Sequence, residues 1–557
     1  MNHRLRVAIL WHFHQPDYRV GNQAVLPWVR LHATKDYAEL PAIHRDFPTL
    51  RLTYNVTPIL AEQLDDYCNG RIEDECGVLS AMDRATAGDD ERLRLLRWAF
   101  VGNAERMINP YVRYRQLRDD AANDKHKTWG QSEWRDLQVW MRLTWLGETA
   151  RRIQSVENML ARGRDFTSDD RERLVALERC LLVAVFQRLR NLVRGGSAEL
   201  ATSPYYHPIL PLVCSSDAIK QSDSDIEPLE PPFSWRCDAV EHTRRALDAM
   251  QRYFRITPRG MWLSEGGISD DALDVLAECG IEWTASDCAI LRRTLGDRES
   301  DQCYRPFVWK RNGRRIAVLF RNSELSDAIG FVYSTWNARD AVADFVERLR
   351  RIRTTLIQQH GRDFLRTAVV PVILDGENCW EYYERNGEPF LRALYDMLSK
   401  SEEFETVTFS DVAQQALADH STTTLDHIVA GSWIGGSFRI WIGHPDDRRA
   451  WEILREARTL LDTHARFLDP SAYALAYRHL LTAEGSDWFW WFGDEHRSAF
   501  QHVFDELFRY HVVQAYHAMG QSPPTELSQP IMTASAYQSP FSAMHPVSLP
   551  TQFQHGD

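Results

Sequence analysis

The sequence predicts an α/β protein, with a barrel or doubly wound parallel sheet followed by a helical domain. Seven apolar or β-rich runs recur over residues 1–400, and most are separated by segments with helical periodicity. Buried parallel strands are continuous apolar runs, and helices connect them. After about Lys400 the pattern changes to helices alone. A chain of 557 residues has room for roughly two to four folding units.

The candidate strands end in residues that can carry chemistry. In chain order they are RVAIL, RLTYNV, AELATS, GMWLS, IEWTAS, IAVLF and AVVPVIL. Glu265, Asp287, Arg321 and Asp375 come directly after the last four of them. Because active sites of parallel barrels lie at the carboxyl ends of the strands, we expect these residues near the functional site.

Between Asp89 and Arg194 no strand is predicted, and a long amphipathic helix begins at TSDDRERL. Asp169 can cap it and Glu172 can return a hydrogen bond, and Gly195 and Gly196 end it. Its apolar face consists of Leu174, Leu177, Leu181, Val185, Leu189 and Leu192. We therefore expect a helical insertion in the barrel at about 85–195, within a catalytic domain over 1–400.

The remaining segments predict loops, a helical domain and a tail. The polar, proline-bearing run 214–235 is expected to form a loop over the strand ends. WEILREARTLLD and HVFDELFRYHVVQAYHAM predict a helical domain over 401–520, with aromatic loops SWIGGSFRIWIGHPDD and GSDWFWWFGDEH. Residues 521–557 contain six Pro and no Lys or Arg, which predicts a disordered tail.

Charge and cysteine content narrow the class of partner and the compartment. The 65 Lys and Arg against 78 Asp and Glu leave a net charge of −13, which argues against nucleic acid or an anionic membrane as partner. The 19 Trp, 19 Tyr and 24 Phe suit neutral sugar rings, and equally a large core. No run approaches the ~20 apolar residues of a membrane helix. Nine Cys without a CxxC pair, and an N-terminus unlike a secretion signal, predict reduced thiols in the cytoplasm.

Glu265 and Asp375 form a pair of carboxyl groups at the ends of two predicted strands. Glycoside hydrolysis needs such a pair, one group to attack or stabilise the anomeric centre and one to protonate the leaving oxygen. The alternative is that each carboxylate caps a helix or pairs with an arginine.

His12 and His14 share one face of the first strand, because alternate residues of an extended chain point the same way. They could be structural, could bind a divalent metal together with further ligands, or could hydrogen-bond sugar hydroxyls as neutral imidazoles.

Five ordered segments resemble the conserved regions of glycoside hydrolase family 57: HFHQP, AELATSPYYHP, GMWLSEGGIS, VILDGENCWEYY and SWIGGSFRIWIGHPDD. The sequence is most similar to the amylopullulanase and α-amylase branch. The resemblance implies a distorted TIM-like (β/α)7 barrel with a helical insertion, followed by an α-helical domain that contributes to the active site. It also implies a retaining mechanism with no cofactor and no required metal.

The same resemblance implies the roles of individual residues. Glu265 corresponds to the nucleophile and Asp375 to the general acid/base. Residues that correspond to the lining of the sugar site are His12, His14, Glu199 and Trp262, and Trp433 is similar to an aromatic platform.

Other residues have a functional and a structural interpretation from sequence. Asp287 could hold a sugar hydroxyl or steady the backbone. Glu377 could tune the pKa of Asp375, or it could be solvated or paired with an arginine. His207 could contact substrate or form a structural hydrogen bond. Trp380, Trp488, Trp490 and Trp491 could stack on glucose rings or pack in the core.

Taken together, the sequence predicts a retaining hydrolase of α-1,4 and also α-1,6 bonds in an α-glucan or maltooligosaccharide. A 4-α-glucanotransferase or a branching enzyme remains open, since transfer and hydrolysis share the covalent intermediate. Outside this class, a metal-dependent polysaccharide deacetylase or mannosidase-like barrel and a non-catalytic glucan-binding protein also remain open. The oligomeric state is not predicted.

Overall fold

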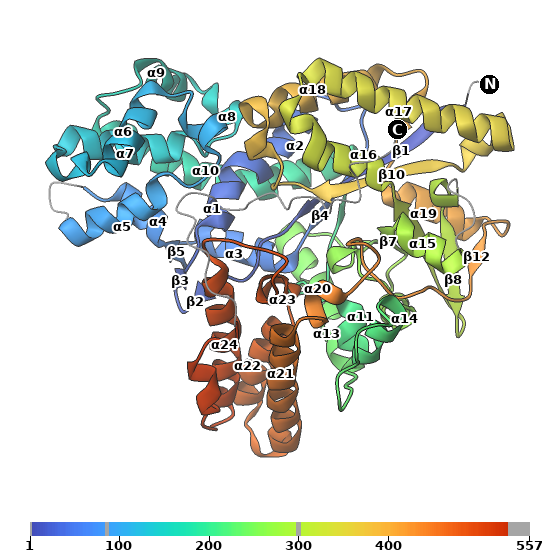
Figure 1. The fold of residues 1–557 in the computed structure, drawn as a ribbon. Coiled ribbons are helices and arrows are strands. Elements are labelled where there is room, and N and C mark those ends of the chain that lie inside the picture. The colour runs from blue at the N-terminus through green and yellow to red at the C-terminus, as the bar shows by residue number, and fades with distance from the viewer. Residues whose placement is uncertain (1–2, 84–87, 297–301, 533–557) are drawn as a thin grey trace. The chain divides into compact units, whose positions relative to one another are not determined.

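A computed structural model describes residues 3–83, 88–296 and 302–532. The chain divides into two compact units, Met1–Phe438 and Arg439–Asp557 (Figure 1). The first unit contains the parallel strands and the second is helical, as the sequence predicts. None of the helices in the described ranges combines the length and apolar character needed to cross a membrane.

Parallel strands form the core of the first unit, and helices lie around them (Figure 1). They are β1 (Leu5–Phe13), β4 (Leu52–Val56), β6 (Ala198–Ala201), β7 (Trp283–Asp287), β9 (Arg314–Arg321) and β10 (Val369–Asp375). β1 pairs with both β10 and β4, and β4 pairs with β6. On the other side, β7 pairs with β9.

A short segment and one hydrogen bond close these strands into a ring. Parallel bridges join Thr202 to Met261 and Gly260 to Trp283, so the segment at 260–262 occupies the place between β6 and β7. The Asn322 N–H donates to the Pro371 carbonyl oxygen at 2.8 Å and links β9 to β10. The predicted seven-membered barrel is confirmed, although GMWLS forms two isolated bridges because the chain turns away at Glu265.

The barrel interior explains the apolar runs of the sequence. Small and large side chains alternate in it, and α19 (Phe409–Ala418) packs against the same cluster. Its members include Ala8, Leu10, Ala201, Trp262, Trp283, Ala285, Ala317, Leu319, Ile373 and Phe409. These residues are fully buried, so the barrel is a packed core rather than a channel.

Helices follow most of the strands, as the alternating pattern predicts. They are α3 (Pro58–Cys68), α13 (Arg236–Phe254), α14 (Asp270–Glu278), α15 (Cys288–Leu295), α17 (Ala338–His360) and α18 (Glu388–Lys400). Between α3 and β6 lies the predicted insertion, of which residues 85–87 are outside the described ranges. Its helices are α5 (Asp89–Ala99), α6 (Val112–Ala122), α7 (Gln131–Leu143), α8 (Glu148–Arg151), α9 (Gln154–Arg162) and α10 (Ser168–Arg194), and α4 (Glu75–Ala81) comes before the predicted range.

The start of α10 differs from the prediction. Its cap is Thr167, whose hydroxyl accepts from the Asp170 N–H at 3.1 Å while the Asp170 carboxylate accepts from the Thr167 N–H at 2.7 Å. The predicted pair of Asp169 and Glu172 is wrong by two residues, because Thr167 satisfies the capping box earlier in the chain.

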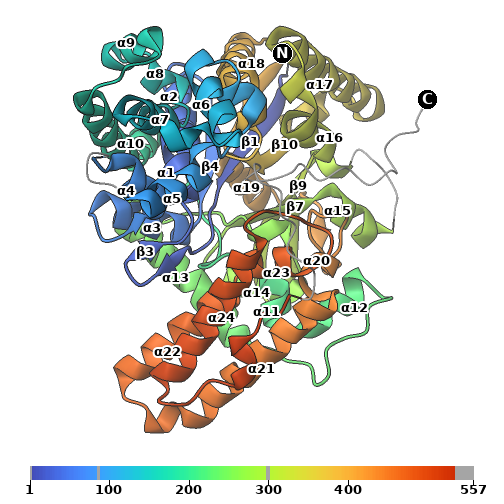
Figure 2. The same cartoon turned by 60° about the vertical axis from the view of Figure 1, so that its left-hand side comes forward.

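The second unit is a helical bundle whose long members lie side by side in both views (Figures 1 and 2). The helices are α20 (Arg439–Ile442), α21 (Pro445–His464), α22 (Pro470–Ala483), α23 (Ser486–Phe492) and α24 (Gln501–Ala518). α23 corrects the prediction of a loop at GSDWFWWFGDEH. Its aromatic residues bury themselves, with Phe489 and Phe492 packing on Phe508 at ring distances of 5.9 and 5.6 Å.

The division between the units falls after Phe438, later than the predicted boundary at residue 400. β11 (Phe404–Thr406) pairs with β1, so the chain stays with the barrel beyond α18. Residues 521–532, the first part of the predicted disordered tail, are ordered, and the Ile531 N–H donates to Asp505 at 3.0 Å. The rest of that prediction, residues 533–557, lies outside the described ranges.

Cys288 and Cys303 form a disulfide between the start of α15 and the segment before β8 (Phe307–Arg311). Both residues are buried, and their Cα atoms are 5.7 Å apart. The expectation of reduced thiols is therefore wrong for this pair, because the end of β7 brings together two cysteines that the sequence separates by fifteen residues. The other seven cysteines remain thiols.

Replacing Gly260 by Ala should lower the thermal unfolding midpoint by several degrees. An added Cβ would lie 1.7 Å from Cε2 of Trp283, and overpacking of this kind costs about 1–3 kcal/mol or more. The matched control is Gly330→Ala, where a Cβ meets no atom within 4 Å. Equal midpoints for the two variants in a thermal melt would contradict this packing of the barrel.

Candidate functional site

The register of three neighbouring strands places polar side chains in one row. His12 of β1 lies opposite Asp375 of β10 on one side and Asn55 of β4 on the other. His12 Nδ1 and Asn55 Oδ1 are 2.7 Å apart, which fixes the imidazole ring. Because all three strands are parallel, the row lies at their carboxyl ends, as the sequence predicts for functional residues.

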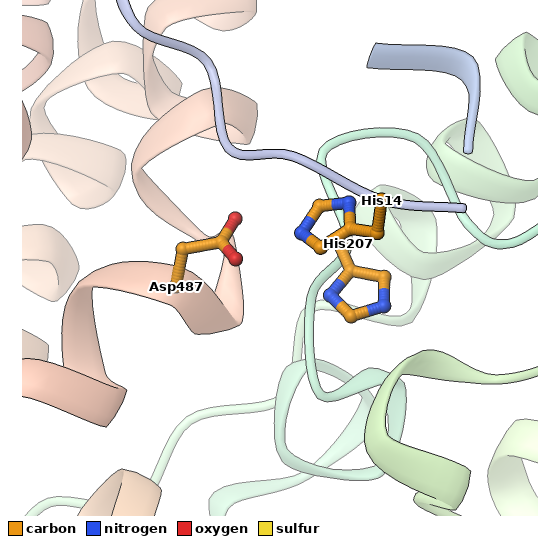
Figure 3. A group of neighbouring side chains, drawn as sticks. All are labelled: His14, His207 and Asp487. Carbon is orange, nitrogen blue, oxygen red and sulfur yellow. The ribbon is translucent and has the colours of Figure 1, made fainter. Parts of the chain in front are cut away.

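Three histidines stack at this end of the barrel. The rings of His14 and His207 have centroids 3.8 Å apart (Figure 3). The centroid of the His12 ring lies 5.2 Å from that of His207. His207 follows β6 in a left-handed backbone conformation with φ of 58°, which aims its ring toward the end of β1. Asp487, also drawn in Figure 3, belongs to the second unit and lies in the first turn of α23.

Burial keeps two of these imidazoles neutral. It lowers the pKa of His12 to about 3, with a further contribution from the charge of His14, and lowers the pKa of His207 well below its ordinary value. A neutral imidazole can both donate and accept a hydrogen bond, which suits a hydroxyl group. His14 and His207 could also give a metal two of its ligands, as the sequence allows for histidines at this strand end.

Asp375 and Glu377 are two carboxyl groups at the end of β10. Burial raises the pKa of Asp375, while a 2.7 Å hydrogen bond from Asn378 and the charges of His14 and Arg321 oppose the rise. Burial and the nearby charge of Asp375 raise the pKa of Glu377 well above its usual range. Glu377 is 4% exposed, so the interpretation in which it is solvated is wrong.

Glu265 lies on a tight turn directly after the Gly260–Trp262 segment. Its backbone is left-handed, with φ of 56° and ψ of 25°, a conformation that costs a residue with a side chain of order 1 kcal/mol or more. Gly266 continues the turn with φ of 59°, and its carbonyl oxygen accepts from the Ser286 hydroxyl at 2.7 Å. A strained residue held by its surroundings is typical of a functional site.

Trp433 holds Glu265 at two points. The Trp433 backbone N–H donates to the Glu265 carbonyl oxygen at 3.0 Å, and the indole Nε1–H donates to the Glu265 carboxylate Oε2 at 2.9 Å. The indole ring also lies 5.3 Å from the ring of Trp262, which is fully buried. The two tryptophans predicted at the sugar site, Trp262 and Trp433, therefore lie beside Glu265. Trp433 belongs to the barrel unit and not to the helical one.

The predicted loop 214–235 makes hydrogen bonds to the segment that follows Trp433. Part of it is helical, with α12 at Ile219–Ser222, and Asp223 follows that helix. Asp223 accepts from the Ser437 hydroxyl at 2.6 Å and from the Phe438 N–H at 3.0 Å. The loop thus fixes the chain that carries Trp433.

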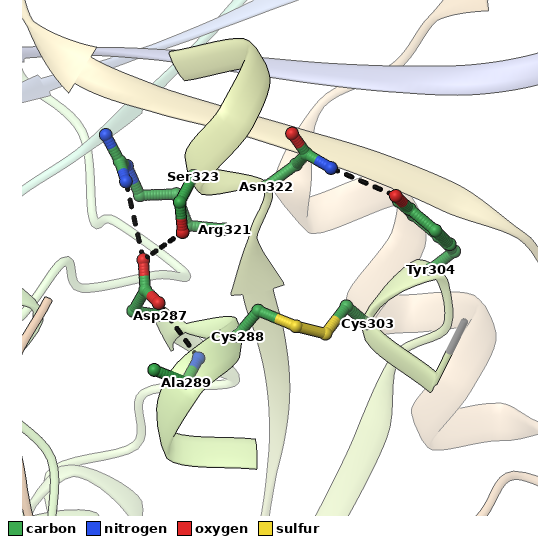
Figure 4. The surroundings of a disulfide bond; sticks show 8 residues. All are labelled: Asp287, Cys288, Ala289, Cys303, Tyr304, Arg321, Asn322 and Ser323. Atoms are coloured by element: carbon green, nitrogen blue, oxygen red, sulfur yellow. Dashed lines mark hydrogen bonds and ion pairs between the residues drawn. A yellow bond between two sulfur atoms is a disulfide. The ribbon is translucent and has the colours of Figure 1, made fainter. Parts of the chain in front are cut away.

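Asp287 ends β7 and has structural partners on every side (Figure 4). It accepts from the Ala289 N–H at 2.9 Å as the cap of α15, accepts from the Ser323 hydroxyl at 2.8 Å, and lies 3.4 Å from Arg321. Of its two interpretations, these contacts favour the one in which Asp287 steadies the backbone.

Three residues predicted to bind substrate have other surroundings in the structure. Glu199 accepts hydrogen bonds from Trp283 and from Ser410 of α19, inside the barrel and before the strand ends. Trp380 is 1% exposed and donates to the Gly376 carbonyl oxygen, and Trp488 is equally buried and donates to Thr482. These contacts favour the core interpretation of Trp380 and Trp488, and the sugar-site role of Glu199 stays a prediction.

Two contributors to the site were not singled out from sequence as site residues, Asn55 and Asn378. Asn55 interrupts the apolar run RLTYNV, and a buried amide in a strand is a signal for a specific partner. Asn378 gives no such signal, because its role depends on the turn that brings it back to Asp375.

Comparison with known proteins gives one family. The model described as glycosyl hydrolase family 57 matches residues 8–426. Alpha-amylase 1 from Dictyoglomus thermophilum is 24% identical over 150 residues, which are 26% of this chain. The match spans only 18% of that relative's length.

Solved structures share the fold at low sequence identity. A family 57 branching enzyme from Thermococcus kodakaraensis is 14% identical with a TM-score of 0.59, and the match covers 92% of this chain and 90% of that one. The α-amylase AmyC from Thermotoga maritima is 15% identical with a TM-score of 0.59, covering 93% of each chain. A 4-α-glucanotransferase from Thermococcus litoralis is 14% identical with a TM-score of 0.53, covering 92% and 60%.

The family match and the geometry concern the same residues. The matched range includes the three stacked histidines, Glu265 on its strained turn and Asp375 at the end of β10. The match extends over most of the barrel unit and well over half of the protein. This chain belongs to glycosyl hydrolase family 57.

Proposed function

We propose that the protein is a retaining α-glucan hydrolase that cleaves α-1,4 and also α-1,6 glucosidic bonds. In the first step the Glu265 carboxylate attacks the anomeric carbon, and Asp375 gives its proton to the departing glycosidic oxygen. In the second step Asp375 takes a proton from water, and the resulting hydroxide oxygen displaces Glu265 from the sugar. The carboxylate is thereby restored.

The observation that carries this proposal is the hydrogen bond from the Trp433 indole to the Glu265 carboxylate. It orients the carboxylate on a turn whose strain the surrounding residues maintain. Attack on carbon requires near-attack alignment, and a positioned nucleophile supplies it without further ordering.

The second carboxyl group has the property that an acid catalyst needs. Burial raises the pKa of Asp375, so the carboxyl group keeps its proton to higher pH than an exposed aspartate. His12, His14 and His207 lie at the same strand end and would bind the hydroxyls of the sugar. The neutral imidazoles of His12 and His207 can form these bonds without changing the net charge of the site.

The choice of α-glucan as substrate comes from the family and its members. Alpha-amylase 1 of Dictyoglomus thermophilum supports hydrolysis, whereas the fold neighbours include a branching enzyme and a 4-α-glucanotransferase. Transfer is the alternative outcome, because the same covalent intermediate can react with a sugar hydroxyl instead of water. A cytoplasmic location is likewise a proposal, supported by seven thiols beside the one disulfide.

Product analysis on maltoheptaose, pullulan and glycogen tests the activity. Hydrolysis of both bond types should release reducing sugar from all three substrates, with the α-anomer formed first in an NMR time course. Disproportionation of maltoheptaose into shorter and longer chains, with no net gain of reducing ends, would assign transfer instead. Loss of activity on dialysis against a chelator, with recovery on adding a divalent metal, would favour the metal-dependent alternative.

Glu265→Gln should lower kcat by on the order of 10⁴-fold or more while glucan binding stays measurable, because an amide of the same shape cannot attack the anomeric carbon. The control is Glu282→Gln, which changes a carboxylate paired with Arg259 just before β7 and should leave kcat within twofold of wild type. Activity of Glu265→Gln within tenfold of wild type would exclude Glu265 as the nucleophile.

Asn378→Ala should shift the alkaline limb of the kcat/KM profile to higher pH. The Asn378 amide donates to the ionised form of Asp375 and so lowers its pKa, and removing the donor lets the pKa rise further. A general acid is active below its pKa and is lost as pH rises through it, so the limb moves upward. An unchanged limb, or the same shift in Asn123→Ala of the helical insertion, would contradict the role of Asp375.

A further inference from the structure

Arg321, at the end of β9, is buried and fixed on three sides. Its Nε donates to the Ile373 carbonyl oxygen of β10 at 2.8 Å, and Nη1 lies 3.4 Å from the Asp287 carboxylate of β7. Nη2 donates to Asp327 at 2.5 Å. The side chain is only 8% exposed, so these contacts set the plane of the guanidinium group.

Asp287, one of the three anchors of Arg321, is itself held in place (Figure 4). Asp287 is fixed by the Ala289 N–H and by the Ser323 hydroxyl, and the next residue, Cys288, is tied by the disulfide to Cys303. The guanidinium group therefore rests on a rigid part of the barrel. A planar cation held in this way can order whatever lies against its face.

The indole of Trp433 lies against that face. The Arg321 guanidinium carbon is 5.2 Å from the centre of the Trp433 ring, within the range of a cation–π contact. The Trp433 segment also contains Gly435 and Gly436 with φ of 60° and 75°, so the backbone on its C-terminal side is of a kind that glycine favours. The hydrogen bond to Glu265 Oε2 requires one particular orientation of the indole ring, and the neighbouring glycines do not impose that orientation.

We propose that Arg321 is a positioning residue, which holds the Trp433 indole in the orientation that aligns the Glu265 carboxylate for attack. This inference rests on the proposed role of Glu265 as nucleophile and adds a residue to which nothing in the conserved segments assigns a role. Arg321 would act through Trp433 without touching the sugar. It would affect the rate of attack more than the affinity for substrate.

The experiment compares Arg321→Gln, Trp433→Phe and the double variant with Arg314→Gln. Trp433→Phe removes the indole N–H but keeps an aromatic ring. Arg314 is the matched control, because it begins the same strand and pairs with two carboxylates, Asp274 at 2.5 Å and Glu278 at 3.2 Å. kcat and KM are measured on maltoheptaose, and thermal midpoints show whether each variant is folded.

Arg321→Gln should lower kcat by on the order of 100-fold with KM within threefold, as expected for a misplaced reacting group. In the Trp433→Phe background, Arg321→Gln should lower kcat by less than threefold. The indole N–H through which Arg321 would act is already absent in that background. Arg314→Gln should leave kcat within twofold. Additive losses in the double variant, or a loss no larger than that of Arg314→Gln, would overturn the proposal.

Two further measurements keep the proposal testable when these assays fail. If Arg321→Gln does not fold, Arg321→Lys keeps the charge for both aspartates but lacks the planar group, and its kcat should fall in the same way. If wild type turns over none of the glucans, the proposed function fails but crystal structures still decide this inference. The Trp433 Nε1 to Glu265 Oε2 contact should be lost in Arg321→Gln, and an unmoved indole would overturn it.

Discussion

The pairing of β1 with β10 and β4 is the constraint on which the rest of the site depends. It sets His12 between Asp375 and Asn55, and it aligns the carboxyl ends of strands that are far apart in the chain. A shift of one residue in this register would turn every side chain to the other face of the sheet. The buried apolar residues Ala8, Leu10 and Ile373 oppose such a shift. The packing of the barrel core therefore also fixes the relative positions of the polar side chains at the strand ends.

Burial then gives the aligned groups their protonation states. The same removal of water raises the pKa of Asp375 and Glu377 and lowers the pKa of His12 and His207. Both directions follow from one cause, the cost of a charge in a poorly solvated place. A protonated acid beside neutral imidazoles is a suitable environment for an uncharged sugar.

Geometry and hydrogen bonding, rather than burial, set the state of the proposed nucleophile, Glu265. Glu265 has a left-handed backbone that is unfavourable for a residue with a side chain, and contacts from Trp433 and from Ser286 to the next residue hold the turn. Arg321 links this turn to β7, β9 and β10. The proposed function and the role of Arg321 therefore both depend on strand ends that are rigid before substrate binds.

The sequence by itself determined the order of strands and helices, the helical insertion and the strand-end position of Glu265 and Asp375, because apolar runs and periodicity are local properties. Only the tertiary structure decided that Glu199 accepts from Trp283, that Trp380 is buried, that Cys288 meets Cys303, and that Trp433 donates to Glu265. It also showed the helix at GSDWFWWFGDEH, where burial of aromatic rings outweighs the signal of the glycines. These features depend on partners distant in the chain, and no pattern within one segment specifies which distant segment will pack against it.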